Sequence, residues 1–399
     1  MKGARFLLPL SLLILLTPGI PRSAAASICE IEPKPAATLL LPYFEVDTVN
    51  LDGIDTLMTI HNASNRRDAV AKVELWSEFG VAVGGFNVYL PANGAQLLDL
   101  RKILDCKLPT AGPPASSPYR TSCASAFPPK PANCTVFQWK KSLTGQPSSY
   151  LGGQCAGTDR GDGIARGYVT VDMMNLCTTQ YQGSLGYFAA GGNGAASNLN
   201  QLWGEYSMVD ARRNEAFGDA LVHIEASVTD PHTSVAGVYT FYGKFVGWAG
   251  ADNREPLSST QRARFVESAL FDDGTDLLVW RDSKSLTSSV ACGGNPAWYP
   301  LGQSSLLFFG MSGGLSANLS ASTALGRVAQ RVHVGGSALP VPAKEGWMNV
   351  TFNTTVTGAT TVPPANPNLD QGWVTAVAGR KNLFQAGASG LQVTSACTP

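Results

Sequence analysis

The chain has 399 residues, and only 15% of them are charged, with 29 Lys and Arg residues against 29 Asp and Glu residues. Globular proteins carry about 25% charged residues. A nucleic-acid-binding protein needs a basic face, whereas the basic pairs Lys140-Lys141 and Arg66-Arg67 are isolated in this sequence. We therefore expect no nucleic-acid partner. The 42 Gly and 25 Pro residues favour many turns and few long helices.

Residues 1–26 have the pattern of a signal peptide. Lys2 and Arg5 precede the apolar stretch Phe6–Leu16, and Ala24–Ala26 provide small residues for cleavage. This stretch is shorter than the ~20 residues that a membrane-spanning helix needs, and no later stretch is long enough. We predict cleavage near Ala26, a secreted or periplasmic location, and no transmembrane segment.

All eight cysteines follow this signal. An even number of widely spaced cysteines in an exported chain indicates disulfides, without the short spacing of a zinc site. Ile28 is bulky where lipoprotein processing requires a small residue, so Cys29 is also assigned to a disulfide. The disulfide candidates are Cys29, Cys106, Cys123, Cys134, Cys155, Cys177, Cys292 and Cys397. Four cysteines allow three connectivities, and our first expectation is local pairing among Cys106, Cys123, Cys134 and Cys155.

Residues 27–105 predict the strands of an N-terminal β-sandwich. Val73 and Leu75 alternate with Lys72 and Glu74, which is the period of a half-buried strand. Short strands separated by Gly, Pro, Asn and Asp turns are typical of sandwiches. The expected strands are Ala37–Val46, Thr56–His61, Ala69–Trp76, Phe86–Leu90 and Gln96–Leu100, followed by a helical turn at Arg101–Asp105.

Residues 106–163 contain many prolines and four of the cysteines. Such a segment buries little apolar surface, so we expect a loop-rich insert or linker that disulfides hold in place. One short strand, Thr135–Trp139, is expected within it.

Residues 164–399 form a C-terminal β-rich region by the same pattern. The expected strands are Gly167–Met173, Ala220–Val228, Val238–Phe245, Asp276–Arg281, Ser305–Phe309, Arg327–Val334, Trp347–Phe352, Gly372–Val377 and Leu391–Ser395. A helix is expected at Ser258–Val266. Helices do not alternate with these strands, which argues against a parallel α/β sheet. The fold class is therefore all-β: one large or two packed antiparallel β-sandwiches with a disulfide-stapled, loop-rich insert.

Several phrases of the sequence resemble a known group. "LLPYFEVD", "VELWSEFGVAV", "RGYVTVDMMNLC", "TDLLVWRDS" and "QRVHVGGSALPVP" are similar to segments of exported bacterial β-rich proteins of unassigned function. The resemblance covers most of the chain after residue 26. It implies a shared β architecture and no activity, cofactor or catalytic residue.

Gly310–Gly314 matches the Gly-x-Ser-x-Gly pattern of a nucleophile elbow, with Ser312 as the serine. That fold requires an acid and then a histidine later in the chain. His333 is the only histidine after Ser312, no acid lies between them, and Asp370 follows His333. A glycine-rich hairpin loop is therefore the favoured interpretation, and we assign no catalytic residue.

The candidate ligand sites are few. The histidines lack zinc spacing, although His223 and Glu225 share a strand face. Asp272, Asp273 and Asp276 crowd one turn and are calcium candidates, but hairpin turns favour Asp without any metal. Neither a metal nor another cofactor is predicted.

Two function classes remain open. The first is a non-catalytic surface, binding or structural protein, with a glycan or a surface protein as a candidate partner; Trp203 and Trp298 near loops are candidate exposed contacts. The second is an extracellular hydrolase that uses Ser312 or carboxylates from distant strands. Its candidate carboxylates are Glu205, Asp210, Glu225, Asp252 and Glu255.

Overall fold

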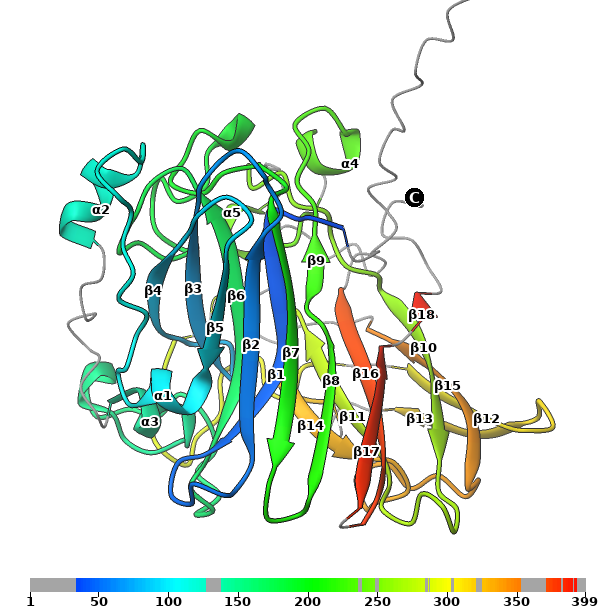
Figure 1. Cartoon of the computed structure of the whole chain (residues 1–399). Coiled ribbons are helices and arrows are strands. Elements are labelled where there is room, and N and C mark those ends of the chain that lie inside the picture. Colours follow the sequence, from blue (N-terminus) through cyan, green and yellow to red (C-terminus); the bar gives the residue numbers. More distant parts are fainter. Residues whose placement is uncertain are drawn as a thin grey trace, which may run out of the picture.

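The computed structural model places strands in four antiparallel sheets (Figure 1). It describes residues 34–126, 138–235, 239–247, 251–283, 286, 288–302, 305–320, 325–352, 371–381, 383–389 and 391–392. Within them the helices are short: α1 (Leu100–Leu104), α2 (Arg120–Ala126), α3 (Gln138–Leu143), α4 (Pro231–Ser234), α5 (Gly243–Val246) and the 3-10 turns η1 (Ser149–Leu151) and η2 (Ala190–Gly192). The all-β prediction is confirmed.

Sheets 1 and 2 form the first sandwich. Sheet 1 has the order β4-β3-β6-β1-β9, and sheet 2 has the order β5-β2-β7-β8. The strands of sheet 1 are β4 (Ala82–Leu90), β3 (Ala69–Ser77), β6 (Ile164–Met174), β1 (Thr38–Asp47) and β9 (Val222–Ile224). Those of sheet 2 are β5 (Ala95–Asp99), β2 (Asp55–Asn62), β7 (Leu202–Asp210) and β8 (Glu215–Ala220).

Sheets 3 and 4 form the second sandwich. Sheet 3 has the order β14-β11-β16-β17, and sheet 4 has the order β13-β12-β15-β10-β18. The strands of sheet 3 are β14 (Ala329–His333), β11 (Gly274–Arg281), β16 (Gly372–Arg380) and β17 (Phe384–Ser389). Those of sheet 4 are β13 (Leu315–Ser320), β12 (Ser305–Gly310), β15 (Glu345–Thr351), β10 (Thr260–Val266) and β18 (Leu391–Gln392).

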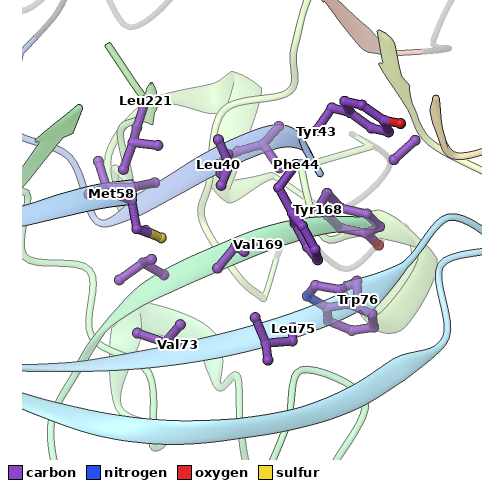
Figure 2. Close-up of a cluster of buried hydrophobic side chains, with 14 of the residues drawn as sticks. Leu40, Tyr43, Phe44, Met58, Val73, Leu75, Trp76, Tyr168, Val169 and Leu221 are labelled. Atoms are coloured by element: carbon purple, nitrogen blue, oxygen red, sulfur yellow. The ribbon is translucent and has the colours of Figure 1, made fainter. Parts of the chain in front are cut away.

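The first core covers both faces of sheet 1, which pack against sheet 2 on one side and against sheet 3 on the other, where Tyr168 meets Trp280. Met58 of β2 alternates with half-buried neighbours and belongs to the same buried cluster as Phe44 of β1 and Val73 of β3 (Figure 2). Trp76 of β3 stacks on Tyr168 of β6, with ring centroids 5.7 Å apart. Aromatic pairs of this kind add about 0.5–1.5 kcal/mol beyond the area that they bury.

Sheet 3 joins the two sandwiches. Leu277 and Val279 of β11 belong to the core of the second sandwich, together with Phe308 of sheet 4. Leu278 and Trp280 of the same strand belong to the core of the first. Because successive side chains point to opposite faces, β11 is buried on both sides. Burial on both faces explains why Leu277–Trp280 is a continuous apolar run and does not alternate with polar residues.

Sheet 1 combines strands from both sides of the insert. β6 lies between β1 and β3, in register Leu39 with Val171 and Val73 with Val171. The structure therefore combines the two predicted architectures: the insert interrupts one sandwich, and a second sandwich packs against it.

Four sequence expectations need correction. The helix predicted at residues 258–266 is strand β10, whose buried Gln261, Ala263 and Phe265 alternate with exposed residues. The segment 238–245 was predicted to be a strand, but it overlaps α5, and none of its described residues lies in a strand. Trp139 lies in α3 rather than in a strand. Strands β7, β8, β13 and β17 were not predicted, apart from Ala220 at the end of β8, although β7 alternates buried and more exposed residues over most of its length.

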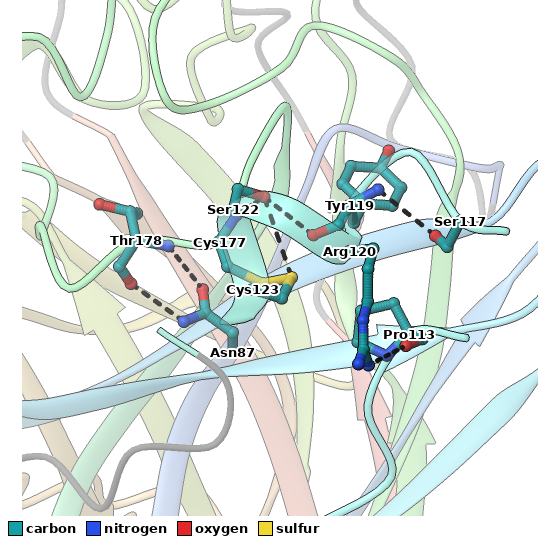
Figure 3. Close-up of a disulfide and its surroundings, with 9 residues drawn as sticks. All are labelled: Asn87, Pro113, Ser117, Tyr119, Arg120, Ser122, Cys123, Cys177 and Thr178. Atoms are coloured by element: carbon teal, nitrogen blue, oxygen red, sulfur yellow. Dashed lines mark hydrogen bonds between the residues drawn. A yellow bond between two sulfur atoms is a disulfide. The ribbon is translucent and has the colours of Figure 1, made fainter. Parts of the chain in front are cut away.

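Two disulfides attach the insert to other parts of the chain. Cys123 of α2 is bonded to Cys177 after β6 (Figure 3), and Cys155 is bonded to Cys292. The expectation of local pairing is therefore wrong for Cys123 and Cys155. Cys106 is also disulfide-bonded. Cys29, Cys134 and Cys397, like the predicted signal peptide, lie outside the described residues.

The disulfide at Cys177 sits beside a second link to the first sandwich. Asn87 of β4 donates its side-chain amide to the Thr178 carbonyl at 3.0 Å, and the Thr178 amide donates back to Asn87 Oδ1 at 3.3 Å (Figure 3).

None of the helices in the described part of the chain is long and apolar enough to cross a bilayer.

Candidate functional site

A hollow of about 340 Å³ opens where the two sandwiches meet, and we call it the charged cleft. Its walls come from β1 and β6 of sheet 1, from β11 and β14 of sheet 3, and from the loops that contain residues 78, 160 and 327. The lining residues are Tyr43, Glu45, Glu78, Arg160, Arg166, Asp276, Arg327, Gln330, Arg331 and His333.

Glu45 is the most heavily engaged acid on the β1 side. Its carboxylate accepts hydrogen bonds from the Tyr43 hydroxyl at 2.9 Å, from Arg166 Nε at 3.3 Å and from Arg331 Nη1 at 3.1 Å. Burial and the neighbouring Glu45 raise the pKa of Tyr43 well above its usual value, so this phenol stays protonated and donates. Arg331 comes from β14, and this contact ties the two sandwiches together.

Asp276 of β11 holds the other side of Arg331. Arg331 Nε donates to Asp276 Oδ2 at 2.6 Å, and His333 Nδ1 lies 2.8 Å from Asp276 Oδ1. Arg331 and His333 are two positions apart on β14, so they project from the same face. The His333 side chain is half exposed at the cleft. A carboxylate at one ring nitrogen orients a histidine and leaves Nε2 for a ligand.

The remaining acid, Glu78, sits in a separate network. It lies after β3, and its side chain is only 4% exposed. Arg160 Nη2 donates to Glu78 Oε2 at 2.7 Å, and the Thr158 amide donates to Glu78 Oε1 at 2.7 Å. Arg327 Nε lies 3.5 Å from Glu78 Oε2. Two guanidinium groups therefore share this one carboxylate.

Arg166 carries a further acid at the edge of the charged cleft. Its Nη1 and Nη2 donate to the two oxygens of Asp162 at 3.1 and 2.7 Å. The hydrogen bonds from Arg166 lower the pKa of Asp162, so this carboxylate stays ionised. The bidentate geometry fixes the Arg166 fork.

A second polar cluster lies further along the same face of sheet 1, fully buried around Asp172 of β6. The Asp172 carboxylate accepts from Thr38 Oγ1 at 2.5 Å, Gln182 Nε2 at 2.7 Å and the Tyr187 hydroxyl at 2.7 Å. The Tyr242 hydroxyl donates to it at 3.0 Å. Since Asp172 is 0% exposed, we assign this cluster to stability and not to ligand binding.

The predicted calcium candidates do not converge. Asp276 binds Arg331 and His333, Asp273 pairs with Arg213 at 2.8 Å, and Asp272 accepts from the Lys381 amide at 3.0 Å. Among the residues that the structure describes, no three His, Cys, Asp or Glu side chains are placed to hold a metal ion. The calcium hypothesis at this turn is therefore not supported by the geometry.

The tryptophan candidates differ from each other. Trp298 is 3% exposed and packs against Phe79, so the prediction of an exposed contact is wrong for this residue. Trp203 is half-buried on β7 and packs edge-on against His61, with centroids 5.1 Å apart. Neither side chain lines the charged cleft.

Ser312 lies in the turn of the β12–β13 hairpin, where the Gly310 amide donates to the Gly314 carbonyl at 3.0 Å. The hairpin interpretation of Gly310–Gly314 is confirmed. A nucleophile elbow instead connects a strand to a helix. His333 belongs to sheet 3 and Ser312 to sheet 4.

The structure does bring two of the predicted carboxylates together. The Glu255 amide donates to the Glu225 carbonyl at 3.0 Å, beside the isolated bridge between Ala226 and Arg254. Both side chains are buried, at 8% exposure for Glu225 and 1% for Glu255, which leaves no access for a polymeric substrate. His223 is also buried; its Nε2 accepts from the Gly204 amide, and burial lowers its pKa to about 4.

The charged cleft was not predicted from the sequence. The sequence does show polar residues that alternate along one face of a strand, Tyr43 and Glu45 on β1 and Arg331 and His333 on β14. That pattern does not reveal that the two strands meet. No protein-family model, curated protein or solved structure matches this chain.

Proposed function

We propose that this chain is an exported, non-catalytic binding protein and that the charged cleft receives its ligand. The single observation that carries the proposal is a concave, polar hollow of about 340 Å³ between the two sandwiches. This volume falls at the lower end of the range of about 300–1,000 Å³ typical of small-ligand sites. Disulfides favour an oxidising compartment, and the resemblance to exported bacterial β-rich proteins supports the same location.

The state of the acids supports binding over catalysis. Glycoside hydrolysis needs one carboxyl group that donates a proton and one free carboxylate. Glu45, Glu78 and Asp276 each accept hydrogen bonds or ion pairs from guanidinium groups. Such contacts occupy the lone pairs of the carboxylates, so these acids orient arginines rather than transfer protons.

A glycan array tests the proposal, because a glycan is the partner class that a hollow lined with hydrogen-bonding groups fits. Labelled full-length oxidised protein is compared with the variant His333→Trp. The larger tryptophan ring is expected to block the opening of the charged cleft, where the His333 side chain is half exposed. His232→Trp, outside the cleft on α4, is the matched control. We expect a glycan that binds the wild type and the control but not His333→Trp. Absence of binding across the array, or binding that His333→Trp leaves unchanged, would overturn the proposal.

An extracellular hydrolase is the second candidate, favoured by the oriented His333–Asp276 pair at 2.8 Å. A histidine held in this way can act as a general base. If Ser312 were the nucleophile, a fluorophosphonate probe would label it. Unlabelled wild-type protein would exclude serine chemistry at Ser312.

A further inference from the structure

We propose that the charged cleft recognises the oxyanion of an acidic sugar, a carboxylate or a sulfate, and that Arg160 and Arg327 hold this group. The inference rests on the proposed binding function and names the chemistry of the ligand. Its basis is the uneven distribution of charge and of unused hydrogen-bond donors between the two halves of the cleft.

Acids outnumber arginines in one half of the cleft, and arginines outnumber acids in the other. Arg166 and Arg331 face three acids, Glu45, Asp162 and Asp276. Arg160 and Arg327 form ion pairs with one acid, Glu78, at 2.7 and 3.5 Å, and Asp162 adds a longer-range attraction to Arg160. Counted by ion pairs among the described residues, positive charge is therefore in excess in this second half. An anionic ligand is attracted there, and the acids of the first half repel it from the other wall.

The same two arginines retain unused donors. A guanidinium group has five N–H donors. Within the described part of the chain, Arg160 donates to Glu78 and, at 3.4 Å, to the Thr158 carbonyl, and Arg327 donates to Thr158 Oγ1 at 3.3 Å. Arg327 Nε is buried without a hydrogen-bond acceptor. The terminal nitrogens of the two guanidinium groups therefore keep donors that an oxyanion can use.

The geometry of guanidinium favours this class of ligand. Its planar fork matches the two oxygens of a carboxylate or a sulfate better than a point charge does. The Arg160 and Arg327 side chains are 29% and 25% exposed, so both can reach a ligand from the hollow. Apart from Tyr43 and His333, the described lining consists of Asp, Glu, Arg and Gln side chains. A sugar ring with hydroxyl groups suits such walls better than an apolar molecule does.

Calorimetric titration of the full-length oxidised protein tests the assignment. The probes are glucuronate, glucose 6-sulfate and neutral glucose, at fixed ionic strength. We expect at least one of the two acidic probes to bind, and glucose to bind at least tenfold more weakly. The comparison of glucuronate with glucose 6-sulfate identifies which oxyanion is preferred.

Two variants with opposite expected effects locate the site. Arg160→Gln should weaken binding of the acidic probe at least tenfold, while Arg327 keeps Glu78 paired in the fold. Glu78→Gln should strengthen it at least threefold, because the competing carboxylate is removed and the new amide oxygen can still accept from the Thr158 amide. Arg213→Gln is the matched control: Arg213 is also shared by two acids, Glu215 and Asp273, but it lies outside the cleft.

The outcomes separate the two proposals. Equal binding of glucose and the acidic probes, or unchanged affinity in both Arg160→Gln and Glu78→Gln, overturns the oxyanion assignment. If glucose binding is then lost in His333→Trp, the binding function survives. If neither the three probes nor any arrayed glycan binds the wild type, both proposals fail.

Discussion

Replacing Asp172 by alanine should destabilise the fold more than almost any other single change to a polar residue. Four side-chain donors converge on its carboxylate at 2.5–3.0 Å, from Thr38, Gln182, Tyr187 and Tyr242. Arg254, only 1% exposed, has its Nε 4.0 Å from the same group. The Asp172→Ala substitution would leave all these donors facing an apolar methyl group.

The expected loss follows from two opposing terms. Hydrogen bonds to a charged group contribute about 1.5–3 kcal/mol each, so four of them amount to roughly 6–12 kcal/mol. Removing the carboxylate also removes its own burial cost, which is several kcal/mol. The net loss in the free energy of unfolding should therefore be about 4 kcal/mol, similar to that for breaking a buried ion pair.

Urea unfolding at neutral pH with the disulfides intact measures this loss, provided that m stays constant so that the midpoint reports stability. Tyr187→Phe removes one donor and should cost about 1–2 kcal/mol. Asp162→Ala, which breaks an ion pair whose acid is 37% exposed, should cost less than about 1 kcal/mol. A loss below about 2 kcal/mol for Asp172→Ala, or one no larger than that of Tyr187→Phe, would refute the reasoning.

Three further changes have defined outcomes. Burial lowers the pKa of His223 to about 4. Its contribution to stability is therefore present above pH 6.5 and is lost, by at most about 3 kcal/mol, as pH falls toward 4. His223→Gln should flatten this pH dependence of stability, and an NMR titration of His223 near pH 6.5 would contradict it. Removing the Cys155–Cys292 bond, which closes a separation of 137 residues, by a double alanine substitution should cost about 4–5 kcal/mol, and an unchanged thermal midpoint would be inconsistent with that role. A Cβ at Gly167 would lie 1.9 Å from the Trp76 carbonyl oxygen, so Gly167→Ala should lower the free energy of unfolding in urea by at least about 2 kcal/mol. A Cβ at Gly310 would have nothing within 4 Å, so the control Gly310→Ala should cost less than about 1 kcal/mol. Equal losses for the two variants would contradict the clash.

The strand content could be predicted from the sequence because alternation is local. Each of the five strands predicted within residues 27–105 coincides with a strand of the structure, and the predicted helical turn at Arg101–Asp105 overlaps α1. Prediction failed where local pattern and tertiary context disagree. The aromatic residues near Tyr239 suggested a strand, but the chain there forms a buried loop and the short helix α5. Gln261 is polar yet buried, because its amide bonds β16 at Val374 and Gly372.

The candidate site could not be predicted in the same way. Glu45 and Arg331 are separated by 286 residues, and Asp276 and His333 by 57. Each residue alone is an ordinary polar position on the face of a strand. Only the packing of sheet 3 against sheet 1 brings them together, and no local rule specifies which sheets pack.

The sequence by itself determined the all-β class and the presence of disulfides, because side-chain period and cysteine number are properties of the chain. The tertiary structure alone decided the partners: β6 between β1 and β3, Cys123 with Cys177, and four arginines around three acids. Those pairings depend on long-range contacts whose gain exceeds the entropy of closing long loops. That balance is set by the whole packed molecule and not by any segment of it.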